Sequence, residues 1–450
     1  MKIISARYVL PISSEPIENG AVAFENDIIA AVGTLKEIIG QFPNAKRESF
    51  GEAAIMPGFI NCHSHLEITA MRGFLDREEN DFYSWLIKLT KTRAEILTDA
   101  DIETAAIFGA LEGARGGVTC FADIGRFGAA GFNALKKNGL RGILFQETEF
   151  SPDDKTVNED FEKLKEKFTR LKETETNLVK VGLSPHAPYT VSRRLFEKIT
   201  DYAIENEIKI TIHAAESVEE QELMTNGTGF FASVYHKYGY EWRNPNCSSI
   251  EYLENIGVLR AKPLLAHCVK VSETDIRLIA ESDSRIAHCP KSNAKFGHGA
   301  APLEKFLDNK IRVGFGSDSV ASNNVCDILE EARFGVLSAR NSLDRKRFIE
   351  PKEAIAAATL GAAKALGLDA EIGTLEAGKQ ADLIVVSLKH AAQQPVHDVY
   401  SALLFASNAR DIHLTTVAGE EIYRDGVSQK IDEAEIKAKM KIIGDKMRKI

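Results

Sequence analysis

The middle of the chain alternates short apolar segments with longer amphipathic ones. Eight apolar segments of strand length occur in the order FINCHSH, VTCFAD, RGILFQE, VKVGLSP, IKITIHA, PLLAHC, SRIAHC and RVGFGSD. Runs of this kind are typical of strands that are buried on both faces of a parallel sheet. Helical patterns separate most of them, and one is bounded by Thr98 and the pair Gly116-Gly117. This succession predicts an α/β fold built on a (β/α)8 barrel of the TIM type.

The two ends of the chain have a different pattern. Residues 1–57 contain KIISARYVL, AVAFENDIIAAVG and RESFGEAAIM, and residues 368–430 contain IGTLEAGKQADLIVVSL and HLTTVAGEEIYRDG. These runs predict short strands that join in one small β-sandwich domain, with the barrel occupying residues 58–367. The remaining residues, 431–450, predict a charged amphipathic helix on the surface.

Composition and charge exclude several classes of partner. The net charge is −9 with both signs interspersed, which argues against a nucleic-acid-binding protein. No apolar run approaches the ~18 residues of a membrane span, and no signal peptide is evident. Six cysteines occur without a C-x-x-C pair, so we expect reduced thiols in a cytoplasmic protein. A small-molecule substrate is the expected partner, and formation of a homo-oligomer is left open.

Histidines gather at the ends of the predicted strands. Six of the eleven histidines lie there, namely His63, His65, His186, His213, His267 and His288, and the eighth strand ends in Asp318. Chemistry in a barrel of this type is built at the carboxyl ends of its strands. A single histidine at such a place is more often a core residue, but the ordered set favours a metal site.

The spacing of His63 and His65 allows both side chains to bind the same metal ion. Strand side chains repeat every two residues, so both rings point to the same side. With His213 and Asp318 they would hold one divalent cation and leave a position open for water. Imidazole and carboxylate suit zinc, iron and manganese, and we expect zinc. Glu216 follows His213 by three residues and is a candidate proton shuttle. The alternative is a glutamate that is present only because the helix dipole favours an acidic residue at a helix N-terminus, and its position beside His213 makes this reading the weaker one.

The stretches PGFINCHSH, SPHAPYT, TIHAAES, LLAHCV, AHCPKSN and GFGSDSVASNN lie in this order within residues 57–324. This set resembles the amidohydrolase superfamily, and within it the branch that holds adenosine-type deaminases and triazine chlorohydrolases. The resemblance implies a single metal ion on His63, His65, His213 and Asp318, because SPHAPY stands where two-metal branches carry a carboxylated lysine. It also implies that His267 hydrogen-bonds the attacking water, that Glu216 protonates the ring nitrogen beside the attacked carbon, and that Asp318 helps to take the water's proton.

Two details of the resemblance bear on the substrate. Glu67 in HSHLE and the segment ESVEEQELMTNGTGFF are similar to aminodeoxyfutalosine deaminases, which act on a purine nucleoside bearing a benzoate. That carboxylate needs a cation, and Arg72, Arg93 and Arg126 are the candidates. The resemblance implies that His186 contacts the substrate.

The thioadenosine and adenosylhomocysteine deaminases carry a glutamate for the ribose hydroxyls after the first strand. The matching place here falls near Thr92, Arg93 and Ala94, and Glu95 is one or two residues away. This departure weakens that assignment.

The sequence therefore predicts a metal-dependent deaminase of an aminated purine nucleoside, with 6-aminodeoxyfutalosine as first choice. The alternatives are methylthioadenosine or S-adenosylhomocysteine, a free base or pterin, chlorohydrolysis of an s-triazine, and a metal-free binding subunit. The last is disfavoured because all proposed ligands are present. Trp85 either closes over a base or packs in the core. The residues expected to bind the substrate are His186, His288, Glu67, Arg72, Trp85, Arg126 and Asn293.

Overall fold

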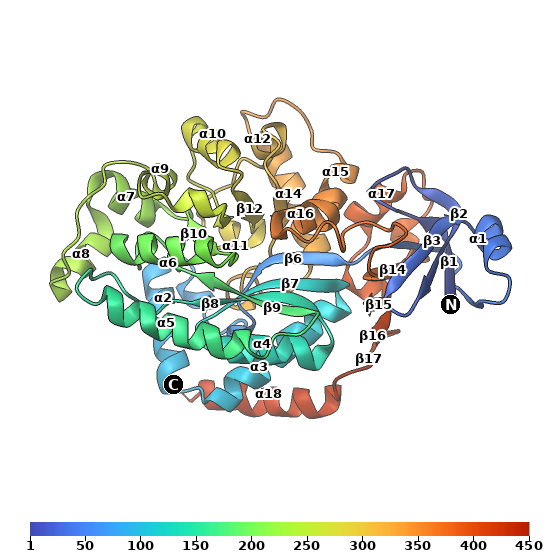
Figure 1. Ribbon diagram of the computed structural model, residues 1–450, viewed down its shortest axis with the longest axis horizontal. Coiled ribbons are helices and arrows are strands. Elements are labelled where there is room, and N and C mark those ends of the chain that lie inside the picture. Colours follow the sequence, from blue (N-terminus) through green and yellow to red (C-terminus); the bar gives the residue numbers. More distant parts are fainter. Residues whose placement is uncertain (450) are drawn as a thin grey trace.

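Eight parallel strands form a closed barrel in the computed structural model, which describes residues 1–449 (Figure 1). One four-stranded sheet contains β6 (Phe59–Ser64), β7 (Val118–Gly125), β8 (Arg141–Glu147) and β9 (Val179–Ser184). The other contains β10 (Thr211–Ala214), β11 (Leu264–His267), β12 (Arg285–His288) and β13 (Val313–Phe315). Parallel bridges from Leu183 to Ile210 and from Ser64 to Asp318 join the two sheets. The predicted barrel is confirmed, and all eight predicted strands are present.

Helices surround the barrel, and most of them cover the outer faces of its strands. Those up to β11 are α2 (Phe82–Glu95), α3 (Asp99–Arg115), α4 (Gly128–Asn138), α5 (Val157–Lys172), α6 (Arg193–Glu205), α7 (Val218–Asn226), α8 (Gly229–Tyr238) and α9 (Ser249–Asn255). Those after it are α10 (Glu273–Glu281), α11 (Pro290–Lys295), α12 (Leu303–Asp308), α13 (Val320–Asn323), α14 (Ile328–Asn341), α15 (Pro351–Ala356), α16 (Ala362–Leu366) and α17 (Val399–Ser401). Thr98 caps α3 as predicted, and the helix stops at Gly116.

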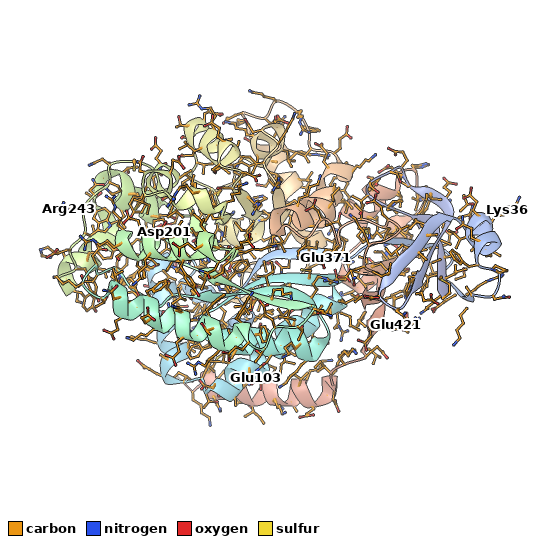
Figure 2. The ribbon with its side chains drawn as sticks, in the orientation of Figure 1. Lys36, Glu103, Asp201, Arg243, Glu371 and Glu421 are labelled. Atoms are coloured by element: carbon orange, nitrogen blue, oxygen red, sulfur yellow. The ribbon has the colours of Figure 1, made fainter. Side chains whose placement is uncertain are left out.

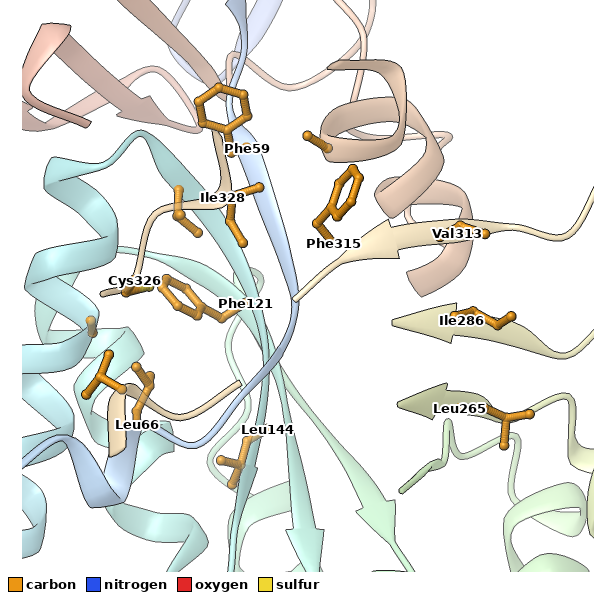
Figure 3. Packing of buried hydrophobic residues seen from close by; sticks show 14 of the residues in the cluster. Phe59, Leu66, Phe121, Leu144, Leu265, Ile286, Val313, Phe315, Cys326 and Ile328 are labelled. Atoms are coloured by element: carbon orange, nitrogen blue, oxygen red, sulfur yellow. The ribbon is translucent and has the colours of Figure 1, made fainter. Parts of the chain in front are cut away.

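Strand alternation divides the barrel side chains into two sets. Phe59, Phe121, Leu144, Leu265 and Ile286 belong to the large cluster between the strands and the outer helices (Figure 3). The inner set is smaller and includes Ile60, Cys62, Cys120, Ala122, Ile143, Phe145, Leu264, Ala266 and Ala287, packed against alanines of α16. The barrel interior is therefore filled below the level at which the histidines emerge.

Strands from both ends of the chain form one nine-stranded sheet. Its hydrogen-bonded order is β17 (Val427–Ser428), β16 (Glu420–Arg424), β15 (Ile412–Val417), β14 (Leu383–Ser387), β5 (Ala53–Pro57), β1 (Lys2–Val9), β2 (Ile17–Glu25) and β3 (Ile28–Thr34), with β4 (Lys46–Ser49) paired to β1. The antiparallel pairing of β5 with β14 joins the two ends. The small helix α1 (Leu35–Gln41) lies at the outer end of this sheet (Figure 1).

The C-terminal helix α18 (Glu433–Met447) returns to the barrel side and packs on α3. Lys446 forms an ion pair with Asp101 at 2.7 Å, and Arg115 forms one with Glu433 at 2.6 Å. The charged side chains Lys36, Asp201 and Arg243 are exposed on the surface (Figure 2). Among residues 1–449, none of the helices combines the length and apolar character needed to span a bilayer.

Candidate active site

Two histidines and an aspartate converge where the first and eighth barrel strands end. The Nε2 atoms of His63 and His65 lie 3.4 Å and 3.6 Å from Oδ1 of Asp318. The pairing of β6 with β7 shifts register between Asn61 and Ser64, so the strand is irregular where the two rings leave it. The backbone N–H of Asp318 donates to the carbonyl of His63 at 2.9 Å, which holds the two strand ends together.

Two serines orient the carboxylate of Asp318. Ser292 and Ser322 donate their hydroxyls to Oδ2 at 2.6 Å and 2.8 Å, so Oδ1 is left to face the imidazoles. Burial opposes ionisation of this carboxyl, but His63 and the other imidazoles outweigh burial and hold its pKa well below the usual value. Asp318 is therefore an anion at neutral pH.

A third imidazole, from His213 on β10, completes the group. Its Nε2 lies 3.2 Å from Nε2 of His65, and its Nδ1 donates to the carbonyl of His186 at 3.1 Å. That hydrogen bond places the ring proton on Nδ1 and leaves a lone pair on Nε2. Burial lowers the pKa of His65 to about 3, so this ring is uncharged. Two ring nitrogens that lie this close are held together best by a cation that both can bind.

This donor set fits a divalent metal ion. Both ring nitrogens of His63 are buried without a hydrogen-bond partner among residues 1–449, and burial lowers the pKa of this ring to about 4. Metal ligands must be deprotonated, as His63, His65 and the carboxylate of Asp318 are. Three imidazole nitrogens and one carboxylate oxygen suit zinc, iron or manganese.

Glu216 and His267 lie side by side next to this group. Oε1 of Glu216 is 3.7 Å from Nε2 of His267, and Asn293 accepts a hydrogen bond from Nδ1 of His267 at 2.9 Å. The bond to Asn293 leaves a lone pair on Nε2. Burial raises the pKa of Glu216 to about 8, so its carboxyl carries a proton at neutral pH. Glu220 braces the preceding loop by accepting the N–H of Glu216 at 2.9 Å.

Two of these residues depend on an unusual backbone conformation. Along β11, Leu265 packs outward, and alternation would turn His267 outward too. Instead His267 has φ 73° and Asp318 has φ 53°. A left-handed conformation is disfavoured for residues with a side chain, and strain of this kind is often stored at functional sites. The strain here redirects the His267 ring and the Asp318 carboxylate toward the other site residues.

His298 was not expected at the site. It is 4% exposed, and its Nε2 lies 3.8 Å from Oε1 of Glu216. Its ring packs against Phe82 with centroids 5.0 Å apart. His298 lies in a loop after α11, not at a strand end, so the strand pattern held no signal for it.

Several predicted substrate-binding residues have protein partners. Asn293 holds His267, as described. Arg72 donates to Glu112 at 2.9 Å and to the carbonyl of Asn324 at 3.0 Å. Trp85 packs edge-on against Phe296 with ring centroids 5.0 Å apart.

His288 lies outside the imidazole group that surrounds Asp318. Its ring is 5.8 Å from that of Phe315. An added Cβ at Gly335 of α14 would meet its Nε2 at 3.5 Å. His288 therefore points outward between the strand and helix α14.

Glu67 and Arg126, two more of the predicted residues, belong to a charged group near the ends of β7 and β8. Arg93 donates to Glu67 at 2.8 Å, and this carboxylate also accepts the N–H of Phe127 at 2.9 Å. Glu67 is thus a buried structural partner of Arg93. Arg126 lies 3.4 Å from Glu149 and 3.7 Å from Glu147, measured from its Nε.

Comparison with known proteins identifies the family of this chain. The model of the amidohydrolase family matches residues 54–422. The chain is 31% identical over 441 residues to a 5-methylthioadenosine/S-adenosylhomocysteine deaminase of Thermodesulfovibrio yellowstonii, and the alignment covers 96% of each protein.

Two solved structures are also similar. A zinc-bound adenosine deaminase of Xanthomonas campestris has a TM-score of 0.88 and 27% identity, with 100% of this chain and 99% of that chain covered. An aminofutalosine deaminase of Helicobacter pylori, in complex with methylthio-coformycin, has a TM-score of 0.78 and 23% identity, with coverage of 94% and 100%. The second likeness shows the fold alone. The chain belongs to the amidohydrolase family, and it is a metal-dependent aminohydrolase.

Proposed function

We infer that the protein hydrolyses the exocyclic amino group from C6 of a purine nucleoside and releases ammonia. The similar proteins support adenosine-type nucleoside deamination. The observation that carries the inference is the position of the buried Glu216 carboxyl, 3.7 Å from Nε2 of His267 and next to the imidazole and carboxylate group, and burial raises its pKa to about 8. A deaminase needs such an acid because the purine ring must gain a proton as water adds to it.

His63, His65, His213 and Asp318 would hold the divalent ion. When bound, the ion supplies the Lewis acidity that makes water a nucleophile near neutral pH. His267 accepts a hydrogen bond from the attacking water through its bare Nε2 and so orients it. Oδ1 of Asp318 takes a proton from that water.

Glu216 gives its proton to N1 of the purine as the water oxygen bonds to C6. The C6–N bond then breaks, and the amino group leaves as ammonia with the proton that Asp318 took from water. The proton of the C6 hydroxyl passes to Glu216, which leaves a carbonyl at C6 and restores the acid. Because Oδ2 of Asp318 is occupied by Ser292 and Ser322, its proton transfer runs through Oδ1.

For the specific substrate we keep 6-aminodeoxyfutalosine as first choice. The observation that favours it is Arg126, at the carboxyl end of β7. Its Nε is buried without a hydrogen bond among residues 1–449, although carboxylates lie 3.4 Å and 3.7 Å away. A guanidinium of this kind suits a carboxylate on the substrate. Arg72 and Arg93 are already engaged by Glu112 and Glu67.

The second candidate is S-adenosylhomocysteine or methylthioadenosine, on the evidence of the sequence relative from Thermodesulfovibrio. S-adenosylhomocysteine also carries a carboxylate, whereas methylthioadenosine has none. Arg126→Gln should therefore reduce activity on either carboxylate-bearing nucleoside and leave activity on methylthioadenosine within a few-fold.

The test is ammonia release by zinc- or manganese-loaded protein from a panel. The panel contains 6-aminodeoxyfutalosine, S-adenosylhomocysteine, methylthioadenosine, adenosine, guanine, an aminopterin and an s-triazine, the last assayed for chloride. Release from 6-aminodeoxyfutalosine above all others is the expected result. Preference for a thio-nucleoside would replace the first choice by the second. Activity only on a base, a pterin or a triazine would refute nucleoside deamination.

A further inference from the structure

A cavity lies at the end of the barrel opposite the proposed active site, where strands β10, β11 and β12 begin. Its volume is about 230 Å³. Its apolar lining includes Phe145, Ile210 and Leu264 from the barrel and Ala365 and Leu366 from α16. Phe145 and Leu264 also belong to the inner apolar set that fills the barrel, so this set separates the cavity from the histidines at the other end. A ligand of this cavity is therefore independent of the proposed reaction.

Basic residues stand where these strands begin. Lys209 comes two residues before β10, Lys262 comes two residues before β11, and Arg285 is the first residue of β12. Neighbouring parallel strands begin at the same edge of a sheet, so the fold brings these three cations together. All three line the cavity, and Arg260 lines it too. Within residues 1–449, Glu207 is the only carboxylate in this lining.

The carboxylates nearby do not balance this charge. Asp283 is shared among three cations: it lies 3.2 Å from Lys262, 3.3 Å from Arg312 and 3.8 Å from Arg285. Lys209 has no carboxylate partner among residues 1–449, and its Nζ donates to backbone carbonyls at the end of α16. Burial and the neighbouring Arg285 lower the pKa of Lys209, as expected where cations outnumber carboxylates. The cavity wall therefore carries an excess of positive charge.

The guanidinium of Arg285 has one donor without a partner. Its side chain is 19% exposed, and its Nη1 donates to the carbonyl of Lys262 at 3.1 Å. Its Nε is buried and has no hydrogen-bond partner in the part of the chain that the structure describes. A buried charged donor that is left unpaired is costly, so its retention points to a ligand that accepts a hydrogen bond. A water molecule would satisfy Nε, but it would leave the excess charge in place.

An oxyanion meets both requirements. Its oxygens accept hydrogen bonds from guanidinium and ammonium groups, and its charge offsets that of the cations. The cavity is smaller than the ~300–1,000 Å³ of pockets that hold drug-sized ligands, so the ligand is small. We propose that this cavity is a binding site for a small oxyanion of the phosphate class, held by Arg285 and Lys209. Arg260 is already paired with Asp201 at 2.9 Å and is not needed for the site.

The experiment measures the binding of inorganic phosphate to the zinc-loaded protein. Titration calorimetry gives the affinity, and the unfolding temperature is compared in phosphate and in chloride at equal ionic strength. The wild type should bind phosphate at this cavity and unfold at a higher temperature in phosphate than in chloride. A hydrogen bond to a charged group is worth roughly 10- to 100-fold in affinity, so Arg285→Gln and Lys209→Gln should each weaken binding by about that factor.

Glycerol 3-phosphate, used in place of phosphate, identifies the source of the anion. If it binds more tightly than phosphate and depends on the same two cations, the site takes the phosphate group of a larger molecule. If only inorganic phosphate binds, the site takes the free anion. Either result supports an oxyanion site.

Arg277→Gln is the matched control. Arg277 is exposed on α10 and does not line the cavity, so this variant removes the same charge and should bind phosphate as the wild type does. Phosphate bound to the zinc ion instead would keep its affinity in both cavity variants, and that result would refute the inference. Equal unfolding temperatures of the wild type in phosphate and chloride would also refute it. Lys209→Gln decides the question if Arg285→Gln does not fold, and deaminase activity has no part in the test.

Discussion

Replacing Glu216 by glutamine removes an acidic proton and keeps the shape of the side chain. Glu216 is 4% exposed, and its Oε1 lies 3.7 Å from Nε2 of His267 and 3.8 Å from Nε2 of His298, both beyond hydrogen-bond distance. Among residues 1–449 the side chain makes no hydrogen bond that the substitution would break, and we expect thermal unfolding to change little. Proton transfer by a placed acid contributes ~10²–10⁴-fold, equivalent to about 3–5 kcal/mol in the activation barrier. Glu216→Gln should lose kcat by that factor.

The pH profile adds a second measurement on the same variant. Because burial raises the pKa of Glu216 to about 8, its proton is present below that pH and is lost above it. Wild-type activity should therefore fall on the alkaline side, and this fall should be absent from the residual activity of Glu216→Gln. Ammonia release measures the rate, and elemental analysis measures the bound metal. Glu219→Gln, in the first turn of α7, is the control and should resemble the wild type. If metal-bound Glu216→Gln kept a kcat within tenfold of the wild-type value, the assigned role would be refuted.

Three further changes test the surrounding residues. His63→Ala removes a fully buried imidazole that we assign to the metal, so the purified protein should contain well under one equivalent of zinc, and added zinc should no longer raise its unfolding temperature; full metal content would contradict the assignment. Asn293→Ala frees Nδ1 of His267, and loss of such an orienting partner should reduce kcat about 10- to 100-fold with the metal retained; an unchanged kcat would speak against it. Burial raises the pKa of Asp123 to about 8, so its contribution to stability is full below about pH 4 and is lost as the pH rises through 8. The free energy of unfolding, measured by urea titration, should therefore fall less steeply with pH in Asp123→Asn than in the wild type between those pH values. Equal slopes would exclude Asp123 as the source of the pH dependence.

The fold could be predicted from the sequence because the patterns that indicate its strands and helices are local and repeated. Each barrel strand is a short apolar run, and helix α3 carries both its capping threonine and its terminal glycine. The joining of the two ends in one sheet followed from strand-like runs at both ends of the chain. The spacing of His63 and His65 placed both rings on one side, and the structure brings both to Asp318.

What the sequence could not provide is the orientation of side chains where the backbone leaves strand geometry. Alternation alone would turn His267 away from the barrel mouth, and the left-handed φ of 73° reverses it. In contrast, His288 keeps regular strand geometry and faces Phe315 on the outer side. Two histidines that look equivalent in the sequence, each at a strand end and each followed by cysteine, thus differ in role because of one backbone torsion. Such a conformation costs ~1–3 kcal/mol. Glycine would adopt this φ without strain. The presence of histidine at this position therefore fits the role that we assign to its imidazole.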